Sequence, residues 1–138
     1  MPKVSHSAFD MISEMTPTFR PGVFVFVTTI DASISEALVT EAISVFREDE
    51  GMSMIIPVEL AEKHALEMEH PMRCITLNVY SSLEGVGLTS AVSAALDANG
   101  IPCNMVAAFH HDHVFVPLDV SERAMQVLVN LQTKAVES

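Results

Sequence analysis

Apolar and polar positions along the first third of this chain predict one short helix followed by a strand. Residues 7–15 place apolar side chains at positions 8, 11, 12 and 15 behind Ser7, which can cap a helix, so this segment predicts a short amphipathic helix. Pro17 and the Pro-Gly pair at 21–22 then break the chain. The β-branched and aromatic run 23–29 that follows predicts a strand buried on both faces.

The next segment predicts a hairpin and a second short helix. Residues 43–48 and 52–56 are strand-like and flank an acidic turn that ends in Gly51. Pro57 ends the second of these strands and begins a helix to about His64, because proline is tolerated at a first helical position. Between the first strand and the hairpin there is room for only a turn or two of helix, at 33–39.

The second half of the chain begins with an alternating strand and a longer helix. Within residues 73–80, Ile75, Leu77 and Val79 share one face, so the other face is left for solvent, a ligand or a partner. An apolar stripe at helical spacing then predicts a helix over about 86–99. The sequence Asn-Gly-Ile-Pro at 99–102 is typical of a helix stop.

The chain ends with a second hairpin and a last helix. Residues 103–110 and 113–118 predict the two strands of that hairpin. Asp119 with Glu122 three residues later resembles a capping box, which predicts the start of an amphipathic helix.

The chain is a duplication. The ten residues from Met54 to Lys63 are echoed by Val114 to Arg123, and every aligned pair except Ala61 with Ser121 is identical or keeps its chemical class. Each copy therefore predicts strand, helix, strand, strand, helix, with a shortened first helix in copy one. We expect an N-terminal helix plus a degenerate first unit over 1–70, and a second unit over 71–138, packed as one body.

Composition narrows the classes of function. An apolar content of 49% without tryptophan predicts a folded, aliphatic core, and a net charge of −11 with scattered basic residues argues against nucleic acid as a partner. Two cysteines, Cys74 and Cys103, form no disulfide framework, and we expect both to be reduced. The N-terminus has no signal-peptide pattern, and the longest apolar run, 23–27, is too short to span a bilayer. We expect a cytoplasmic protein with no membrane contact.

This duplicated strand-helix-strand-strand-helix unit, with a glycine-bearing turn after its first strand, resembles the ACT domain, a regulatory fold of amino-acid-metabolism enzymes such as aspartokinase. Residues 75–92 and 110–117 are similar to a family of small bacterial tandem-ACT proteins of unassigned function. The resemblance covers nearly the whole chain and is most specific over 74–120. One departure is that Ser81 and Ser82 stand where the commoner ACT pattern has an aspartate.

The resemblance implies an α+β fold of two ferredoxin-like ACT units, βαββα repeats with antiparallel sheets and helices on one face. It also implies a small-molecule effector, usually an amino acid, held where ACT units meet, often within a dimer. A complete ACT unit has a fourth strand, which copy one could borrow from residues 73–80. Copy two would then keep an open edge, and we expect two chains or two copies to join their sheets there, with a homo-oligomer as the result in the first case.

The turn over 81–89 is the candidate ligand site. Its backbone N–H groups and the positive end of a helix dipole suit a carboxylate, and Gly85 and Gly87 allow a ligand to approach the backbone closely. Glu84 would oppose a phosphate but could hold an ammonium group, so an amino acid is the favoured ligand. The alternative is that these glycines merely permit a tight turn. The predicted ligand-binding residues are Asn78, Ser81, Ser82, Glu84, Gly85, Val86, Gly87, Leu88 and Thr89.

A histidine cluster gives a weaker, metal-binding alternative. A two-residue turn at 111–112 would set His110 opposite His113, with His111 beside them. The spacing matches no established zinc motif, and a polar hairpin tip is common, so we expect no metal and no cofactor. No nucleophile with a base and no paired carboxylates are evident, so we expect a regulatory module rather than an enzyme, with no catalytic residues. Binding of a partner protein along the open sheet edge is a further alternative.

Overall fold

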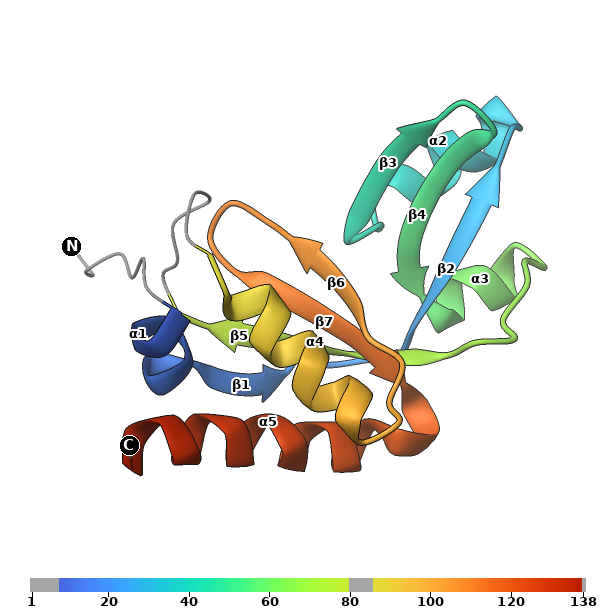
Figure 1. Cartoon of the computed structure of the whole chain (residues 1–138). Helices are drawn as coiled ribbons and strands as arrows, with labels where there is room; N and C mark the ends of the chain where they lie inside the picture. The colour runs from blue at the N-terminus through green and yellow to red at the C-terminus, as the bar shows by residue number, and fades with distance from the viewer. Residues whose placement is uncertain (1–7, 80–85, 138) are drawn as a thin grey trace. The chain divides into compact units, whose positions relative to one another are not determined.

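The structure, a computed structural model, describes residues 8–79 and 86–137 and divides into two compact units (Figure 1). Residues 22–72 form one unit, called here the inserted unit. The described parts of residues 1–21 and 73–138 form the other, called here the discontinuous unit. The expected ranges 1–70 and 71–138 follow the sequence repeat, whereas the compact units group the N-terminal helix with the second copy.

The discontinuous unit is a four-stranded sheet with three helices packed against it. The strands lie in the order β1-β5-β7-β6, and β6 and β7 form the second predicted hairpin (Figure 1). This is the ferredoxin-like order, in which the fourth strand lies beside the first and the hairpin lies on the other side. The elements are α1 (Ala8–Glu14), β1 (Thr16–Phe19), β5 (Met72–Asn78), α4 (Leu88–Ala98), β6 (Asn104–Ala107), β7 (Asp112–Pro117), the 3-10 turn η1 (Leu118–Val120) and α5 (Ser121–Glu137).

The strand β1 was not predicted, and it overturns the expected open edge. It pairs antiparallel with β5, from Thr16 opposite Asn78 to Phe19 opposite Ile75. The Asn78 side-chain amide donates to the Thr16 carbonyl at 2.8 Å and to the Thr18 hydroxyl at 2.7 Å, which pins the two strands together. The prediction that copy two lacks a fourth strand and keeps an open edge was therefore wrong, because the N-terminal segment supplies that strand.

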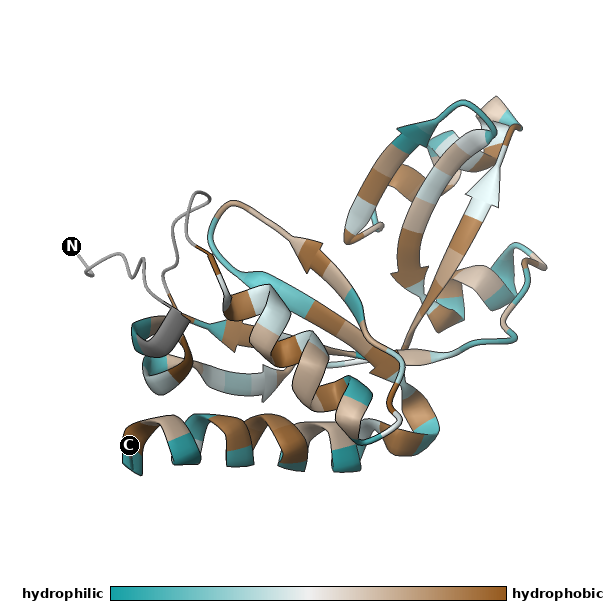
Figure 2. Cartoon of the chain, viewed as in Figure 1, coloured by the Kyte–Doolittle hydropathy of each residue, from teal (hydrophilic) through white to brown (hydrophobic). Residues whose placement is uncertain are grey.

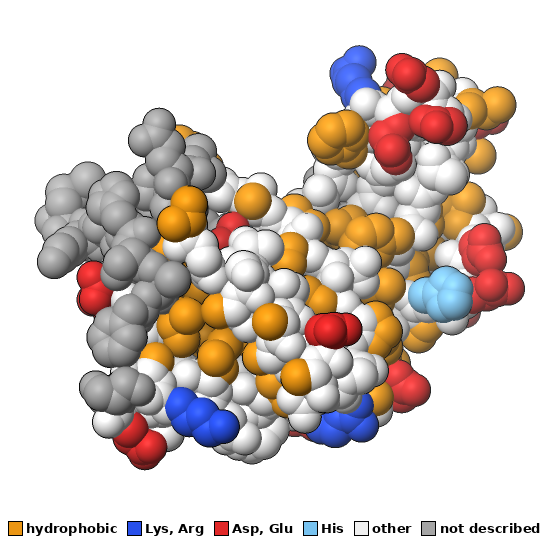
Figure 3. Space-filling view, viewed as in Figure 1, with side chains coloured by type: hydrophobic (Ala, Val, Ile, Leu, Met, Phe, Trp, Pro, Cys, Tyr) orange, Lys and Arg blue, Asp and Glu red, His pale blue; other side chains and the backbone are white. Residues whose placement is uncertain are grey.

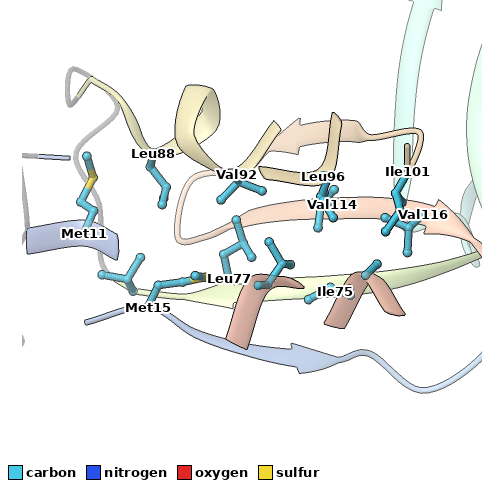
Figure 4. Close-up of a cluster of buried hydrophobic side chains, with 13 residues drawn as sticks. Met11, Met15, Ile75, Leu77, Leu88, Val92, Leu96, Ile101, Val114 and Val116 are labelled. Carbon is cyan, nitrogen blue, oxygen red and sulfur yellow. The ribbon is translucent and has the colours of Figure 1, made fainter. Parts of the chain in front are cut away.

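One face of this sheet forms the main core (Figure 4). The predicted stripe of α4 is confirmed, since Leu88, Val92 and Leu96 are 3%, 0% and 0% exposed. Apolar and polar bands alternate along α5, as its amphipathic pattern requires (Figure 2). The buried cluster contains Met11, Met15, Ile75, Leu77, Val79, Leu88, Val92, Leu96, Ile101, Val114, Val116, Ala124 and Leu128.

The inserted unit is a three-stranded sheet with two short helices. Its strands lie in the order β3-β4-β2, and the predicted hairpin is confirmed by the pairing of Glu48 with Gly51. Met72, the first residue of β5, lies opposite Phe24 on the other side of β2. A separate core contains Val25, Leu38, Met54, Ile56, Leu60 and Ala61. The elements are β2 (Phe24–Thr29), α2 (Ala32–Val39), β3 (Ser44–Glu48), β4 (Gly51–Pro57) and α3 (Val58–Lys63).

Burial along β2 corrects one expectation. Val25 is 2% exposed and joins the core, but Phe26 is 46% exposed. The prediction of a strand buried on both faces was therefore wrong. A run of β-branched and aromatic residues shows that a segment is a strand, but it does not show whether a second layer covers both faces.

The duplication is visible in the backbone at the two matching prolines. Pro57 has φ −59° and ψ 142°, and Pro117 has φ −55° and ψ 139°, so each ends a strand and leads into a helix in the same way. The one non-matching pair of the repeat, Ala61 and Ser121, is buried in both copies, at 0% and 4% exposed. Small size, not polarity, is what that position requires.

The predicted capping box before the last helix was wrong. Asp119 lies inside η1, whose N-cap position is held by Pro117, and α5 begins at Ser121. The Ser121 hydroxyl donates to the Leu118 carbonyl at 2.8 Å instead. The proline ring fixes φ of Pro117, and the 3-10 turn begins directly after it. Asp119 is therefore already inside this turn and cannot serve as the N-cap.

We expect the N-terminal segment to be an integral part of the discontinuous unit's core. Met15→Ala should lower the free energy of unfolding by about 2–5 kcal/mol, because Met15 is 0% exposed and its removal leaves a cavity. Met68→Ala is the matched control: this methionine is 39% exposed, and its loss should cost no more than about 0.5 kcal/mol. Urea denaturation of both variants tests this, and equal midpoints would show that the segment does not stabilise the unit.

Candidate functional site

The predicted ligand site follows β5 and leads into α4. Four of its nine predicted residues, Ser81, Ser82, Glu84 and Gly85, lie outside the described residues. The structure describes Asn78 at the end of β5 and the run from Val86 to Thr89 at the start of α4. These two stretches fix the two ends of the turn.

Gly87 begins α4 in a conformation that favours glycine. Its φ is 102° and its ψ −21°, in the left-handed region where a Cβ atom would be strained. Its carbonyl accepts the first helical hydrogen bond, from the Ala91 N–H at 2.9 Å, and no side chain caps the helix from this position. The N–H groups of the first turn have no carbonyl acceptor within the helix, so the amides of Leu88 and Thr89 can serve an anion.

The described side chains at this end of α4 differ in what they can offer. Leu88 is 3% exposed and lies in the core, so only its backbone can meet a ligand. Val86 is 75% exposed, and Thr89 is also exposed. Asn78 is half-buried, and its amide already donates to β1. Contact between these residues and a ligand stays a prediction.

The first helix of copy one, α2, has a different kind of N-cap. The sequence analysis did not predict this N-cap. Asp31 is the N-cap of α2, and one carboxylate oxygen accepts from the Ser33 N–H at 2.8 Å and the Ile34 N–H at 3.2 Å. The Ser33 hydroxyl donates to the same oxygen at 2.6 Å. These hydrogen bonds lower the pKa of Asp31. In copy one, the carboxylate of Asp31 thus occupies the helix N-terminus. An aspartate directly before an apolar helical segment is a recognised sign of an N-cap, so the sequence contained this signal.

Histidines from β7 and the turn before it lie against β5. Nδ1 of His113 is 3.0 Å from the Thr76 hydroxyl, and Nδ1 of His111 is 3.4 Å from the Val79 carbonyl. The second contact is at the end of β5, where the chain leaves the sheet toward α4. The two imidazole rings are themselves 6.5 Å apart, edge to face. These contacts join the second hairpin to the strand that leads into the predicted site.

The expected pairing of His110 with His113 was wrong. In the structure His113 lies opposite Val106 and Asp112 opposite Ala107, while the Ala108 N–H donates to the His111 carbonyl at 3.1 Å. The chain therefore turns over residues 108–111, because that register places the apolar side chains of β7 in the core. Within residues 8–79 and 86–137, no three His, Cys, Asp or Glu side chains are placed to hold one metal ion.

Neither cysteine has the features of a reactive thiol. Both are free; Cys74 is buried and Cys103 is half-buried. Burial raises the pKa of Cys74 to about 11 and raises that of Cys103 as well. A thiol with a raised pKa carries little thiolate at neutral pH, so these side chains act as small apolar groups.

No helix in the described part of the chain is both long enough and apolar enough to cross a membrane. A cytoplasmic location stays a prediction from the sequence.

The half-buried position of His113 should make the protein less stable in mild acid. Burial, followed by the charges of His111 and Arg20, lowers the pKa of His113 below 6.5, and Asp112 opposes this shift. As pH falls through 6.5, the unfolded chain takes up a proton that the folded chain does not, so the free energy of unfolding decreases.

His113→Gln should flatten the loss of stability between about pH 7.5 and 5.5, since glutamine does not titrate. Urea denaturation across this range measures the slope. Partial burial raises the pKa of the half-buried Asp112 carboxyl above 3.8. Asp112 therefore acts in a more acidic window and in the opposite direction, because there the folded chain binds the proton more readily than the unfolded chain. A variant that keeps the wild-type slope would show that His113 is not the group responsible.

Solved structures of other proteins share this fold. A protein of unknown function from Vibrio cholerae, whose description adds "Possible Transport Protein", is 34% identical with a TM-score of 0.80, over 90% of this chain and 94% of that one. A protein from Agrobacterium tumefaciens is 20% identical with a TM-score of 0.66, over 86% and 89% of the two chains.

A putative C-terminal regulatory domain of aspartate kinase from Porphyromonas gingivalis is 15% identical with a TM-score of 0.56, over 86% and 96% of the two chains. No curated protein matches the chain.

Two family models, both described as ACT domain, match the chain in tandem. The first covers residues 9–73 and the second residues 69–130. The first match contains the whole of copy one, and the second contains copy two up to a point within α5. The predicted tandem of ferredoxin-like units is thereby confirmed, and the chain belongs to the ACT-domain family of regulatory, ligand-binding modules.

Proposed function

We propose that this chain is a non-catalytic regulatory module whose effector is an amino acid bound where β5 leads into α4. The effector's carboxylate accepts hydrogen bonds from the first amides of α4. Its ammonium group lies toward Glu84, as the sequence predicts. ACT-domain membership supports the regulatory, ligand-binding role, and the contrast between the two helix N-termini supports the location.

The observation that carries the proposal is the different capping of two equivalent helices. In α2 the carboxylate of Asp31 accepts from the first-turn amides, which supports a carboxylate as a partner for the N-terminus of such a helix. In α4 the N-cap is Gly87, which has no side chain to play that part. An anion at a helix N-terminus is stabilised by about 0.3–1 kcal/mol, and by up to about 2 kcal/mol when partly buried. A ligand carboxylate would thus replace the group that copy two lacks.

Charge favours an amino acid over a phosphorylated ligand. The chain has a net charge of −11, so it repels a multiply charged anion at long range. An amino acid at neutral pH has no net charge, and its carboxylate and ammonium groups match the amides of α4 and the Glu84 carboxylate respectively. The effector's side chain would decide which amino acid binds.

A thermal-shift screen tests the proposed ligand class. A ligand that binds only the folded state stabilises it by about 2.7 kcal/mol at a concentration one hundred times its Kd. We expect at least one of the twenty amino acids to raise the melting temperature, and nucleotides and zinc to leave it unchanged. Stabilisation by zinc alone would favour the histidine alternative, and no response to any amino acid would contradict the proposal.

Thr89 gives a sharper test than Gly87, because replacing Gly87 would strain the backbone at φ 102° whatever its effect on a ligand. Thr89→Glu places a carboxylate in the first turn of α4, where it favours the helix but repels the ligand's carboxylate. We expect the affinity for the stabilising amino acid to fall about tenfold or more, since about 1.4 kcal/mol corresponds to a factor of ten.

Thr89→Gln is the matched control, with nearly the same size and no charge. It should keep the ligand response, and both variants should melt within a few degrees of the wild-type protein without ligand. Equal affinity in the two variants would place the ligand's carboxylate elsewhere.

A further inference from the structure

The sheet of the discontinuous unit has a second face, on the side away from the main core. Phe19 of β1 lies opposite Ile75 of β5 and both pack in that core, so the residues that alternate with them point to the second face. In β7 the core residue Val114 gives the same alternation. Arg20 extends the β1 ladder, because its N–H donates to the Cys74 carbonyl at 2.9 Å. The residues of the second face are Thr16, Thr18, Arg20, Cys74, Thr76, Asn78, Asn104, Val106, His113 and Phe115.

Four polar side chains from neighbouring strands meet on the second face. Thr18 lies opposite Thr76, and the Thr76 hydroxyl is 3.0 Å from Nδ1 of His113. In the tautomer in which Nδ1 accepts from this hydroxyl, Nε2 carries the ring proton and can donate to a ligand. Together with Arg20, these side chains are called here the Arg20 cluster.

The position of the Arg20 side chain is supported by its electrostatic effect on its neighbours. Burial has the largest effect on the pKa of Cys74, which it raises, and on the pKa of His113, which it lowers. The positive charge of Arg20 is a smaller influence that acts to lower both pKa values. The guanidinium therefore lies near both side chains, on the second face.

The Arg20 cluster is accessible to a solute and borders a closed apolar area. Its two members from the β1 segment are exposed, and its members from β5 and β7 are half-buried. On the same face, Cys74 and Phe115 are 1% and 2% exposed. A charged contact beside such an area is screened less than one that is surrounded by water.

The charge of the second face favours an anion. None of the residues assigned to this face is acidic, although the whole chain has 18 acidic residues against 7 basic ones. Acidic side chains gather elsewhere, for example at the β3–β4 turn, at Glu48, Asp49 and Glu50 (Figure 3). Asp112 directly precedes His113, but the alternation of β7 places it on the core side.

We propose that the Arg20 cluster is a second ligand site, which binds the carboxylate of a small organic acid that has no amino group. The planar guanidinium makes two parallel hydrogen bonds with the carboxylate, and the Thr18 hydroxyl and Nε2 of His113 donate to its remaining lone pairs. An ammonium group would find no acidic partner on this face and would lie near the positive charge of Arg20, so an amino acid is disfavoured. The net charge of −11 disfavours a di- or trianion.

Pyruvate and alanine are matched probes, because they share a carbon skeleton and differ in having a keto oxygen or an ammonium group beside the carboxylate. Each is titrated to about 10 mM, tenfold above a Kd of about 1 mM, into ¹⁵N-labelled full chain in a buffer without carboxylate or phosphate. We expect pyruvate to shift the amides of Thr18, Arg20, Thr76 and His113 saturably and alanine to leave them unchanged. No saturable shift at these residues, or equal shifts with alanine, would overturn the proposal.

Arg20→Gln tests the residue that carries the positive charge. It should weaken pyruvate binding about tenfold or more and leave the melting temperature unchanged, because the side chain is exposed. Arg47→Gln is the matched control: this exposed arginine belongs to the inserted unit, and its loss changes the net charge equally, so the variant should bind as the wild-type protein does. Wild-type affinity in Arg20→Gln would overturn the proposal. Equal weakening by both variants would also overturn it, since net charge would then be the cause.

The response of the α4 amides to an amino acid reports on a different ligand and a different set of residues. It should be the same in the wild-type protein and in both arginine variants. Failure of the second site and failure of the site at α4 are therefore distinguishable in the same spectra.

Discussion

The pairing of β1 with β5 is the constraint on which the discontinuous unit depends. It completes a four-stranded sheet from segments that are more than fifty residues apart, and the Asn78 side chain ties the two strands where β5 ends. The segment that carries β1 also brings Met11 and Met15 into the main core. The Arg73 guanidinium of β5 lies 4.0 Å from the centre of the Phe19 ring of β1, a cation–π contact between two partly buried side chains that also joins these strands.

This pairing also determines where the candidate site can be. Because Asn78 is held by β1, and Val79 is contacted by His111, the end of β5 is fixed from both sides. Gly87 then fixes the start of α4 through a backbone conformation that few other residues adopt. The sheet and the helix thus set both ends of the turn, and the packing of α4 through Leu88, Val92 and Leu96 fixes the direction in which its first amides point.

Several features set by local chemistry were predictable from the sequence, whereas features set by distant pairing were not. The stop of α4, the hairpin at Gly51 and the prolines that lead into α3 and α5 each follow from neighbouring residues. Strand β1 was not predicted because it is only four residues long and contains Pro17, which is typical of a chain break; its pairing with β5 makes it a strand. The predicted register of the second hairpin was wrong for a similar reason, because core packing and not the turn sequence sets that register. At the site, the tight backbone at Gly87 could be predicted from the sequence. Asp31, which directly precedes the helical segment of α2, could have been predicted as its N-cap but was missed.

After duplication, the two copies have diverged at the N-terminus of their first helix. Both keep the strand, proline and helix that hold the fold, but copy one carries a carboxylate at the first helix where copy two carries glycine. The central claim, that only copy two receives the ligand's carboxylate, can be tested by amide chemical shifts of ¹⁵N-labelled protein titrated with the stabilising amino acid. The account predicts that the largest shifts fall on Gly87, Leu88 and Thr89, with those of α2 unchanged. Shifts concentrated at Ser33 and Ile34, or on the face of the sheet away from α4, would contradict it.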